Sequence, residues 1–368
     1  MTRPRVAIAH DYLTQRGGAE RVVLALHRAF PEATVHTLLY DAEETFPEFR
    51  DIPVVTSPLN HVSVLRRHHR LGLPVLAAAA GRMVVDADVT VVSTSGWAHG
   101  FDFRGRTVVY CHNPARWLYQ AEEYVGDARA LTVPALGLRA LSPALRRWDR
   151  KAAARHDRYL ANSTVVRDRI EATYGREAPV LFPPATVTGA GPQAPVGPFP
   201  PGFHLLVSRL LPYKNVDKAV AAFAGLPDER LLIIGQGPDE QRLRAAMPAN
   251  VALVGGVSDA ELRWAYASCT ALLAPSIEDF GLTPLEAGAF GKPTLALRRG
   301  GYLDTVAEGI TGLFLERPEA ADIVDAVHRE RAIEWDPEAI EKHAQQFGEE
   351  QFRDAIVAEV DAQLASAT

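Results

Sequence analysis

The sequence has few cysteines and no long apolar run. Only two of its 368 residues are cysteines, Cys111 and Cys269, and both lie in apolar surroundings. Two isolated cysteines form neither a disulfide framework nor the paired spacing of a metal site, so we expect both to be reduced. The longest apolar runs, such as Leu73 to Ala80, are far shorter than the roughly 20 residues that cross a bilayer. These absences disfavour a membrane-spanning protein and a disulfide-stabilised secreted domain.

A targeting sequence is also missing from the first residues. They show no basic, apolar and small-residue succession typical of a secretory signal, so we expect a cytoplasmic protein. An apolar content of 47% with 23% charged residues is typical of soluble globular proteins. The length suggests two domains of roughly 150 to 200 residues each.

Charge is distributed unevenly along the chain. Residues 1–185 carry 24 Lys and Arg against 19 Asp and Glu, whereas residues 186–368 carry 15 against 26. Basic clusters lie at Arg66-Arg67-His68-His69-Arg70 and between Arg139 and Arg158. These clusters are either solvated helix faces or a surface that binds anions. The anions would be lipid head groups, which implies peripheral contact with the inner membrane face, or a phosphorylated acceptor. No aromatic residues interleave with these cations, so we expect no nucleic-acid partner.

Two successive arrays of strands and helices predict an α/β protein. The first array has expected strands at 6–9, 89–92, 107–110, 158–161 and 179–182, with helical patterns between several of them, including one at 19–30. Residues 183–202 contain closely spaced prolines and glycines and predict an interdomain linker. The second array has expected strands at 204–207, 231–234, 251–254, 271–274 and 294–297, with helices at 216–223 and from 259.

The two arrays predict two Rossmann-like domains that face each other across a cleft. We place the first domain at 1–185, the linker at 186–202 and the second domain at 203–350. The amphipathic terminal helix, about 351–364 within a segment 351–368, is expected to pack back toward the first domain.

The segment Glu278-Asp-Phe-Gly-Leu-Thr-Pro-Leu-Glu286 is the most informative in the chain. It follows an apolar strand and opens a helix, which is where α/β proteins build ligand sites. Thr283 is expected to be the N-cap of this helix, with Pro284 at its first position and Glu286 completing a capping box. A capping box needs no ligand, so the segment alone leaves a structural and a ligand-binding role open for Glu286.

Other chemically suggestive residues follow the expected strands. Arg209 and Lys214 lie between a strand end and a helix start, which favours an anion site. Gly17 and Gly18 form a glycine turn at a helix start that could approach a phosphate. His112 follows the strand 107–110 and is suited to ligand chemistry, although a structural role is equally open.

Two further patterns are weak. Gly235-Gln-Gly237 lacks the third glycine of a dinucleotide fingerprint and is followed by Pro238, which disfavours a dehydrogenase. Asp86-Ala-Asp88 mimics a metal-binding pair but precedes a strand, so we expect no metal site there.

These motifs together resemble the retaining glycosyltransferases of family 4, which have the GT-B fold. The resemblance is carried by Gly17-Gly18-Ala19-Glu20, by His112-Asn-Pro-Ala-Arg116, by Ser208-Arg209 with Lys214, and by Glu278 with Glu286. It covers nearly the whole chain. The stretches His10 to Leu13 and Tyr110 to Tyr119 are most similar to the GDP-mannose-dependent mannosyltransferase branch of polysaccharide assembly, although that branch often has Thr at the position of Asn113.

The resemblance implies a role for each matching residue. Arg209 and Lys214 would hold the donor diphosphate without an obligatory metal or other cofactor, and Glu286 would bind the ribose hydroxyls. Glu278 and the backbone N–H groups of 280–282 would orient the donor sugar. The remaining residues implied at the donor are Gly17, Gly18, His112 near the reacting carbon, Val257 near the base, and Phe280, Gly281 and Leu282.

The expected function is retaining transfer of a hexose, mannose from GDP-mannose, to a glycan or lipid-linked acceptor. Negative charge that builds on the leaving diphosphate would be stabilised by preorganised cations and N–H groups. A UDP-sugar-dependent transferase of the glucose or GlcNAc type and a nucleotide-sugar epimerase are the alternative enzymes. A catalytically silent nucleotide-sugar-binding protein is the alternative from another class.

Overall fold

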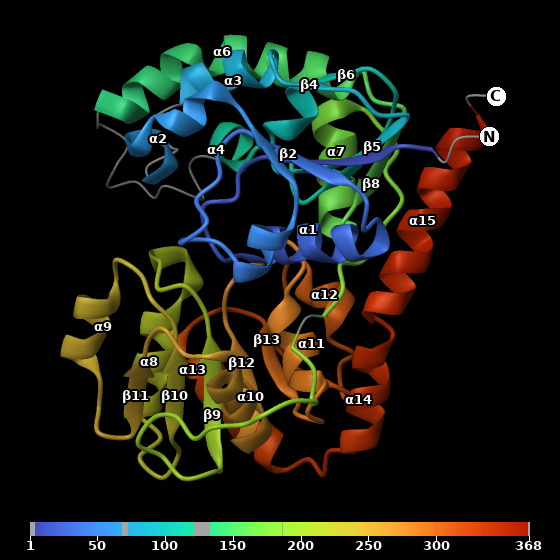
Figure 1. Ribbon diagram of the computed structural model, residues 1–368. Helices are drawn as coiled ribbons and strands as arrows, with labels where there is room; N and C mark the ends of the chain where they lie inside the picture. The colour runs from blue at the N-terminus through green and yellow to red at the C-terminus, as the bar shows by residue number, and fades with distance from the viewer. Residues whose placement is uncertain (1–3, 68–72, 121–132, 186, 367–368) are drawn as a thin grey trace. The chain divides into compact units, whose positions relative to one another are not determined.

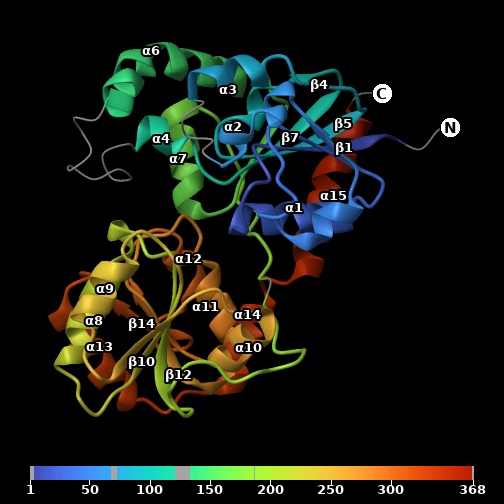
Figure 2. The same ribbon diagram turned by 60° about the vertical axis from the view of Figure 1, so that its left-hand side comes forward.

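The structure is a computed structural model that describes residues 4–67, 73–120, 133–185 and 187–366. The chain forms two compact units, which are described separately. Unit 1 comprises Met1–Pro184 and Glu349–Thr368, and unit 2 comprises Ala185–Gly348. Within the described residues, each unit contains a six-stranded sheet whose neighbouring strands are all parallel, so the α/β prediction is confirmed (Figures 1 and 2).

The sheet of unit 1 has the strand order β3-β2-β1-β5-β7-β8. The strands are β1 Val6–His10, β2 Thr34–Thr37, β3 Val54–Thr56, β5 Val89–Thr94, β7 Arg106–Cys111 and β8 Arg158–Ala161, with a small separate pair β4 Val84–Val85 and β6 Asp102–Phe103. The helices are α1 Gly18–Ala29, α2 Ser63–Arg67, α3 Leu73–Ala80, α4 Arg116–Tyr119, α6 Val133–Ala153, α7 Thr164–Tyr174 and α15 Glu349–Ala365.

Helices cover both faces of this sheet because its strand residues are apolar on both sides. Ile8, Val91 and Val108 pack on the face that α1 and α15 cover. Ala9, Val92 and Val109 pack on the opposite face, toward α3, α6 and α7. Near-continuous apolar strands are what a parallel sheet buried on both faces requires.

The terminal helix α15 belongs to unit 1. It lies beside α1 in both views (Figures 1 and 2) and packs Phe352, Ile356 and Val360 into the core under that face. Arg158 of β8 donates two hydrogen bonds of 2.9 Å to Glu359, which joins the helix to the sheet edge.

The sheet of unit 2 has the order β11-β10-β9-β12-β13-β14. The strands are β9 Phe203–Val207, β10 Leu231–Ile234, β11 Val251–Val254, β12 Cys269–Ala274, β13 Thr294–Leu297 and β14 Gly312–Leu315. The helices are α8 Val216–Ala224, α9 Glu240–Ala246, α10 Asp259–Ser268, α11 Leu282–Gly288, α12 Tyr302–Thr305, α13 Ala320–Arg331 and α14 Pro337–Gln345. Helices α8 and α13 cover one face, and α10 and α11 lie on the other.

Two expectations about residues 179–202, where unit 1 passes into unit 2, need correction. Residues 179–182 form no strand, because only one isolated bridge, between Ala161 and Val180, joins them to β8. The proline-rich segment has no helix or strand in its described part, but it is not a free linker. Val187 is buried in the core of unit 2, and the backbone N–H of Ala194 donates to the carbonyl of Ala260.

No helix in the described part of the chain is both long and apolar enough to cross a membrane. Cys111 and Cys269 are both buried, and no disulfide joins them in the described part of the chain.

Candidate functional site

The predicted site residues lie at the carboxyl ends of strands in both units. Unit 2 contains Arg209, Lys214, Val257, Glu278, Phe280, Gly281, Leu282 and Glu286, and unit 1 contains Gly17, Gly18 and His112. In each sheet the strands are parallel, so the loops that follow neighbouring strands meet at one edge.

Lys214 and Glu278 form an ion pair at this edge of unit 2. Lys214 ends a 3-10 turn, Pro212–Lys214, that follows β9, and Glu278 lies in the loop after the neighbouring strand β12. The lysine is 6% exposed, and its ammonium lies 4.9 Å from the centre of the Tyr213 ring. Ser276 donates a second hydrogen bond of 2.8 Å to the same oxygen of Glu278. Both charges are therefore held in place before any ligand binds.

A hydrogen bond from a side chain to a backbone carbonyl also joins the two loops. Asn215 adopts the left-handed conformation, with φ of 56°, and its side-chain amide donates to the carbonyl of Pro275 at 2.9 Å. The Ser276 hydroxyl, which donates to Glu278, also lies 3.2 Å from the Tyr302 hydroxyl. Burial and the charge of Glu278 raise the pKa of Tyr302, so this phenol stays protonated. Several hydrogen bonds from different segments therefore meet around Glu278.

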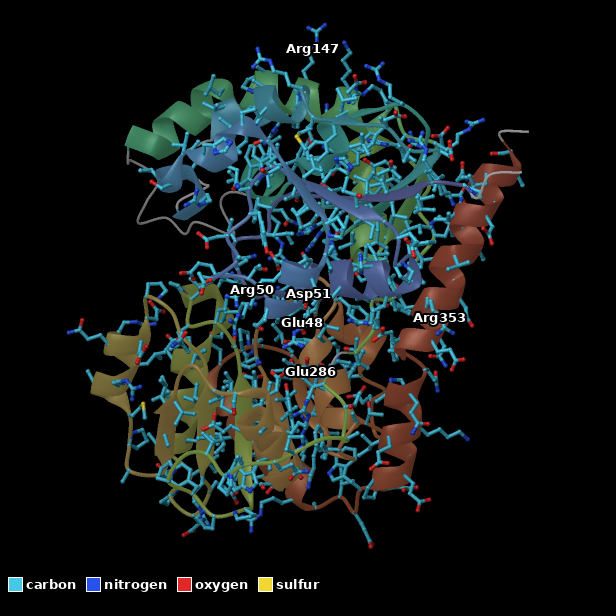
Figure 3. The ribbon with its side chains drawn as sticks, viewed as in Figure 1. Glu48, Arg50, Asp51, Arg147, Glu286 and Arg353 are labelled. Carbon is cyan, nitrogen blue, oxygen red and sulfur yellow. The ribbon has the colours of Figure 1, made fainter. Side chains whose placement is uncertain are left out.

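Glu286 is buried and bound to a tyrosine. The Tyr266 hydroxyl, on α10, donates a hydrogen bond of 2.7 Å to Oε2 of Glu286, which is 8% exposed. Figure 3 labels Glu286 on α11. A buried carboxylate needs such donors because desolvation strongly disfavours its charge.

The predicted capping box at Thr283 is wrong. Helix α11 begins at Leu282, its N-cap is Gly281, and no side chain caps it. Gly281 has a φ of 87°, and a Cβ atom there would lie 2.5 Å from the ring of Tyr302, so only glycine fits. The helix therefore starts earlier than expected, and Thr283 lies within its first turn. Glu286 then has no capping role.

The remaining predicted site residues of unit 2 differ in their exposure. Arg209 is exposed, and within the described part of the chain no ion pair holds its guanidinium. Phe280 is 4% exposed, whereas Leu282 and Val257 are half-buried. The next residue, Ser258, forms a true capping box with Glu261 at the start of α10. The structure thus brings Lys214 and Glu278 together but shows no contact between Arg209 and either of them.

Gly235, in the weak dinucleotide pattern, has a packing role. A Cβ atom at this position would lie 1.8 Å from the carbonyl oxygen of Ser208. The glycine lets the loops after β9 and β10 approach each other closely, which explains it without a dinucleotide.

In unit 1, His112 directly follows β7 and is 8% exposed. Its Nε2 lies 2.8 Å from the Ser93 hydroxyl, which in turn lies 3.0 Å from Nδ1 of His10. Burial, with a smaller contribution from His10, lowers the pKa of His112 to about 3, so the ring is neutral near pH 7. Gly17 and Gly18 lie at the start of α1, as expected.

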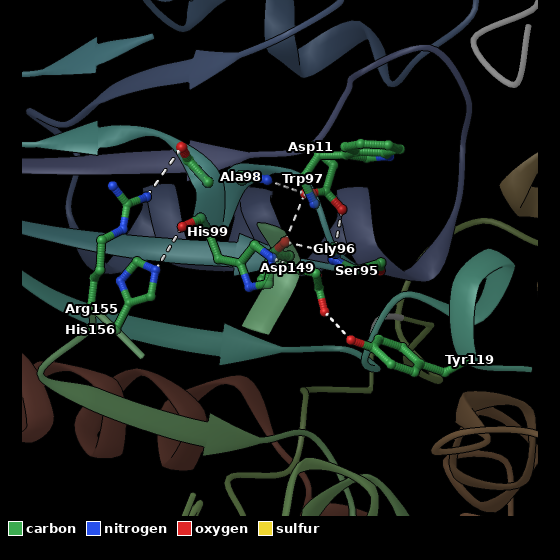
Figure 4. A network of polar contacts seen from close by, with 12 residues as sticks. Asp11, Ser95, Gly96, Trp97, Ala98, His99, Tyr119, Asp149, Arg155 and His156 are labelled. Atoms are coloured by element: carbon green, nitrogen blue, oxygen red, sulfur yellow. Dashed lines mark hydrogen bonds and ion pairs between the residues drawn. The ribbon is translucent and has the colours of Figure 1, made fainter. Parts of the chain in front are cut away.

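A second polar network supports the loop after β5 (Figure 4). Asp11 accepts hydrogen bonds from the Thr94 hydroxyl at 2.8 Å and from the backbone of Ser95, Trp97 and Ala98. Further into unit 1, buried Asp149 of α6 pairs with His99 at 2.9 Å and accepts from Tyr119 at 2.8 Å. The bonds to Asp11 fix the loop after β5, and the bond between Tyr119 and Asp149 joins α4 to α6.

Several of these contact residues were not predicted. Ser93, Tyr266, Ser276 and Tyr302 carry no motif, and their partners are distant in the sequence. The sequence offered one indication for Ser93. This residue directly follows the predicted strand 89–92, and the carboxyl ends of neighbouring strands lie at the same edge of the sheet.

Comparison with known families now gives the affiliation. Residues 16–185 match the family model described as Glycosyltransferase Family 4, and residues 200–349 match Glycosyl transferases group 1. The chain belongs to glycosyltransferase family 4. The family resemblance of the sequence is therefore confirmed.

Relatives of this family 4 glycosyltransferase include two proteins described as GDP-mannose-dependent alpha-mannosyltransferases. The one from Mycolicibacterium smegmatis is 34% identical over 191 residues, which are 49% of this chain and 50% of that protein. The one from Corynebacterium glutamicum is 34% identical over 130 residues, 35% of this chain and 30% of that protein. The alignments thus span half or less of the length of these relatives.

Solved structures agree on the fold of this family 4 glycosyltransferase. The Anabaena protein HepE in complex with UDP and glucose has a TM-score of 0.69 at 17% identity, covering 98% of this chain and all of that one. Sucrose-phosphate synthase from Thermosynechococcus elongatus has a TM-score of 0.69 at 18% identity, with both chains covered completely. The fold is GT-B.

Proposed function

We propose that this protein is a retaining glycosyltransferase that transfers mannose from GDP-mannose to a glycan or lipid-linked acceptor. The observation that carries the proposal is the cluster of Lys214, Ser276 and Glu278 in unit 2, together with the buried Glu286 on α11, the next helix along the chain. It combines a buried cation for a diphosphate with carboxylates for the hydroxyls of a sugar and a ribose. The mannosyltransferase relatives support the choice of donor.

The proposed reaction depends on charge stabilisation. As the glycosidic bond to the diphosphate breaks, negative charge grows on the leaving oxygen, and Lys214 together with Arg209 would neutralise it. Lys214 would then exchange part of its bond with Glu278 for the phosphate, which frees that carboxylate to accept from the sugar hydroxyls. The backbone of 280–282 would orient the sugar, and Val257 would lie by the base. No metal or other cofactor is needed for this step in the proposal.

The roles of Gly17, Gly18 and His112 at the donor stay predictions of the family resemblance. Each lies at the end of a strand or the start of a helix in unit 1, as that resemblance requires. Their contribution would be seen as loss of turnover, with little change in the stability of unit 2.

A donor panel tests the proposal. Calorimetry should show tighter binding of GDP than of UDP, and GDP-mannose should be turned over with a suitable glycan or lipid-linked acceptor. The product should keep the anomeric configuration of the donor, which proton NMR reports. Tighter UDP binding would replace the mannosyl donor with a UDP-sugar, the ligand named for HepE. Release of UDP with an isomerised sugar in the absence of acceptor would indicate an epimerase.

Peripheral membrane contact is a separate proposal. Arg147 on α6 is exposed and extends away from the helix (Figure 3), in keeping with a basic outer surface. In the other basic cluster, Arg66 is drawn toward Asp41 at 3.6 Å, and residues 68–70 lie outside the described residues. Co-sedimentation with vesicles containing anionic lipid, compared with neutral vesicles, would test this contact.

A further inference from the structure

The Ser93 hydroxyl lies between two imidazole rings in unit 1. It is 2.8 Å from Nε2 of His112 and 3.0 Å from Nδ1 of His10. The sheet enforces this placement, because His10 of β1 is in register with Ser93 of β5, and His112 follows the next strand, β7. Ser93 is fully buried and His10 is 2% exposed, so water does not substitute for these bonds.

A carbonyl oxygen decides where the protons lie. Nδ1 of His10 is also 3.1 Å from the backbone oxygen of Ser93, and a carbonyl oxygen can only accept. Nδ1 of His10 must therefore carry a hydrogen, which it shares between the carbonyl and the hydroxyl. The opposite assignment would direct a nitrogen lone pair at a carbonyl oxygen in a buried site, which is unfavourable.

The single hydrogen of the Ser93 hydroxyl then has one destination. Since the hydroxyl oxygen accepts from His10, its own hydrogen points to Nε2 of His112, which must be the unprotonated nitrogen. The ring of His112 is neutral near pH 7, so its one hydrogen is on Nδ1. Among the described residues, no side chain or backbone group forms a hydrogen bond with that Nδ1, and His112 is 8% exposed.

We propose that Ser93 and His10 are positioning residues that hold His112 in the Nδ1–H tautomer, so that His112 donates a hydrogen bond to an oxygen of the sugar donor. That this oxygen belongs to a sugar donor rests on the proposed function, whereas the tautomer of His112 does not. In this arrangement His112 acts as a neutral donor and not as a general base. The relay His10–Ser93–His112 sets this property from the interior of the sheet.

The tautomer is directly measurable in the wild-type protein. The protein has 12 histidines, so ¹⁵N-histidine labelling with a long-range ¹H–¹⁵N correlation near pH 7 is practical, and the variant His112→Gln assigns the His112 signals. We expect the Nδ1 resonance of His112 in the range of a protonated nitrogen and Nε2 in that of an unprotonated one. The reverse pattern, or an averaged one, overturns the inference.

Substitutions at Ser93 test the relay and its consequence. Ser93→Ala should move His112 to a mixed or Nε2–H tautomer and lower kcat/KM by roughly threefold to tenfold, the effect of one neutral hydrogen bond. Ser93→Thr keeps a hydroxyl and should restore the wild-type tautomer. Ser57→Ala is the matched control. It removes another buried hydroxyl of unit 1, which donates to the Leu38 carbonyl at 2.7 Å, and should leave the His112 spectrum unchanged.

The two proposals fail in different ways. If the wild-type protein shows the Nδ1–H tautomer but transfers no sugar, the proposed function is wrong and the relay stands. If it transfers sugar with His112 in the Nε2–H tautomer, the relay is wrong. An unchanged tautomer in a folded Ser93→Ala variant would also refute it.

Discussion

Replacement of Lys214 by methionine separates its structural role from its proposed role at the diphosphate. Methionine keeps most of the length and apolar volume of the lysine side chain and removes its charge. The lysine is 6% exposed and forms an ion pair with Oε1 of Glu278. In the variant this oxygen loses the ammonium and keeps the hydrogen bond from Ser276. We expect unit 2 to lose stability and the protein to lose turnover, by different amounts.

The stability effect lies between two limits. An exposed ion pair contributes about 0–1 kcal/mol, and breaking a fully buried one costs about 3–5 kcal/mol. The Glu278 side chain is 25% exposed, so solvent relieves part of the cost, and a loss of about 1–3 kcal/mol in the free energy of unfolding follows. The double variant Lys214→Met/Glu278→Gln should recover much of this loss, since it leaves no unpaired charge.

Turnover should fall much further than stability implies. Loss of a preorganised cation at a developing negative charge costs on the order of 100-fold in kcat. The double variant should recover stability but not turnover, because the phosphate would still lack its cation. Thermal unfolding, calorimetry with the nucleoside diphosphate and steady-state transfer measure the three quantities.

Lys218 provides the matched control for this experiment. It lies on α8, its side chain is 40% exposed, and it pairs with Glu319 at 3.0 Å. Lys218→Met should leave nucleotide binding and turnover close to wild type. The reasoning is refuted if Lys214→Met binds the nucleotide and transfers sugar as the wild type does, or if the double variant regains activity together with stability.

Three further predictions concern other contacts. Tyr266→Phe removes the 2.7 Å bond to Glu286 and should lower the free energy of unfolding by about 1.5–3 kcal/mol and weaken nucleotide binding, both measurable by calorimetry; unchanged binding would argue against a ribose role for Glu286. Burial lowers the pKa of His156 to about 3, below its ordinary value, so the unfolded chain binds the extra proton and stability is lost as pH falls from about 6.5 toward 3. His156→Gln should therefore reduce the slope of unfolding free energy against pH, between about pH 4 and 6, by up to about 1.4 kcal/mol per unit, and an unchanged slope would contradict this. Gly281→Ala should destabilise unit 2 by more than about 1 kcal/mol in denaturant unfolding, because its φ of 87° and the Tyr302 ring both exclude a Cβ atom; wild-type stability would show that the loop can adjust.

The predicted strands were the most reliable part of the sequence analysis, for a local reason. Apolar runs such as Val89 to Val92 are long enough to identify a buried strand, and β5 contains all of that run. The segment 179–182 shows the limit of the approach. Its apolar residues resemble a strand, but they lie beside β8 with only one bridge, since pairing depends on the neighbour and not on the segment.

The start of α11 shows a second limit. The order of Thr283, Pro284 and Glu286 matches a capping box, and local rules favour a helix that begins at Thr283. Gly281 adopts a left-handed conformation against the ring of Tyr302, a residue 21 positions later, and this contact starts the helix earlier. A local signal was overridden by packing from outside its window.

The sequence by itself determined two α/β arrays, the type of residue at each strand end and the membership of a glycosyltransferase family. Only the tertiary structure decided which of those residues meet. Lys214 pairs with Glu278 because β9 and β12 are neighbours, and Tyr266 reaches Glu286 because α10 packs beside α11. Periodicity is encoded within a few residues and can be read locally. Strand order and helix packing depend on the burial of the whole core, and they bring together side chains that are far apart in the sequence.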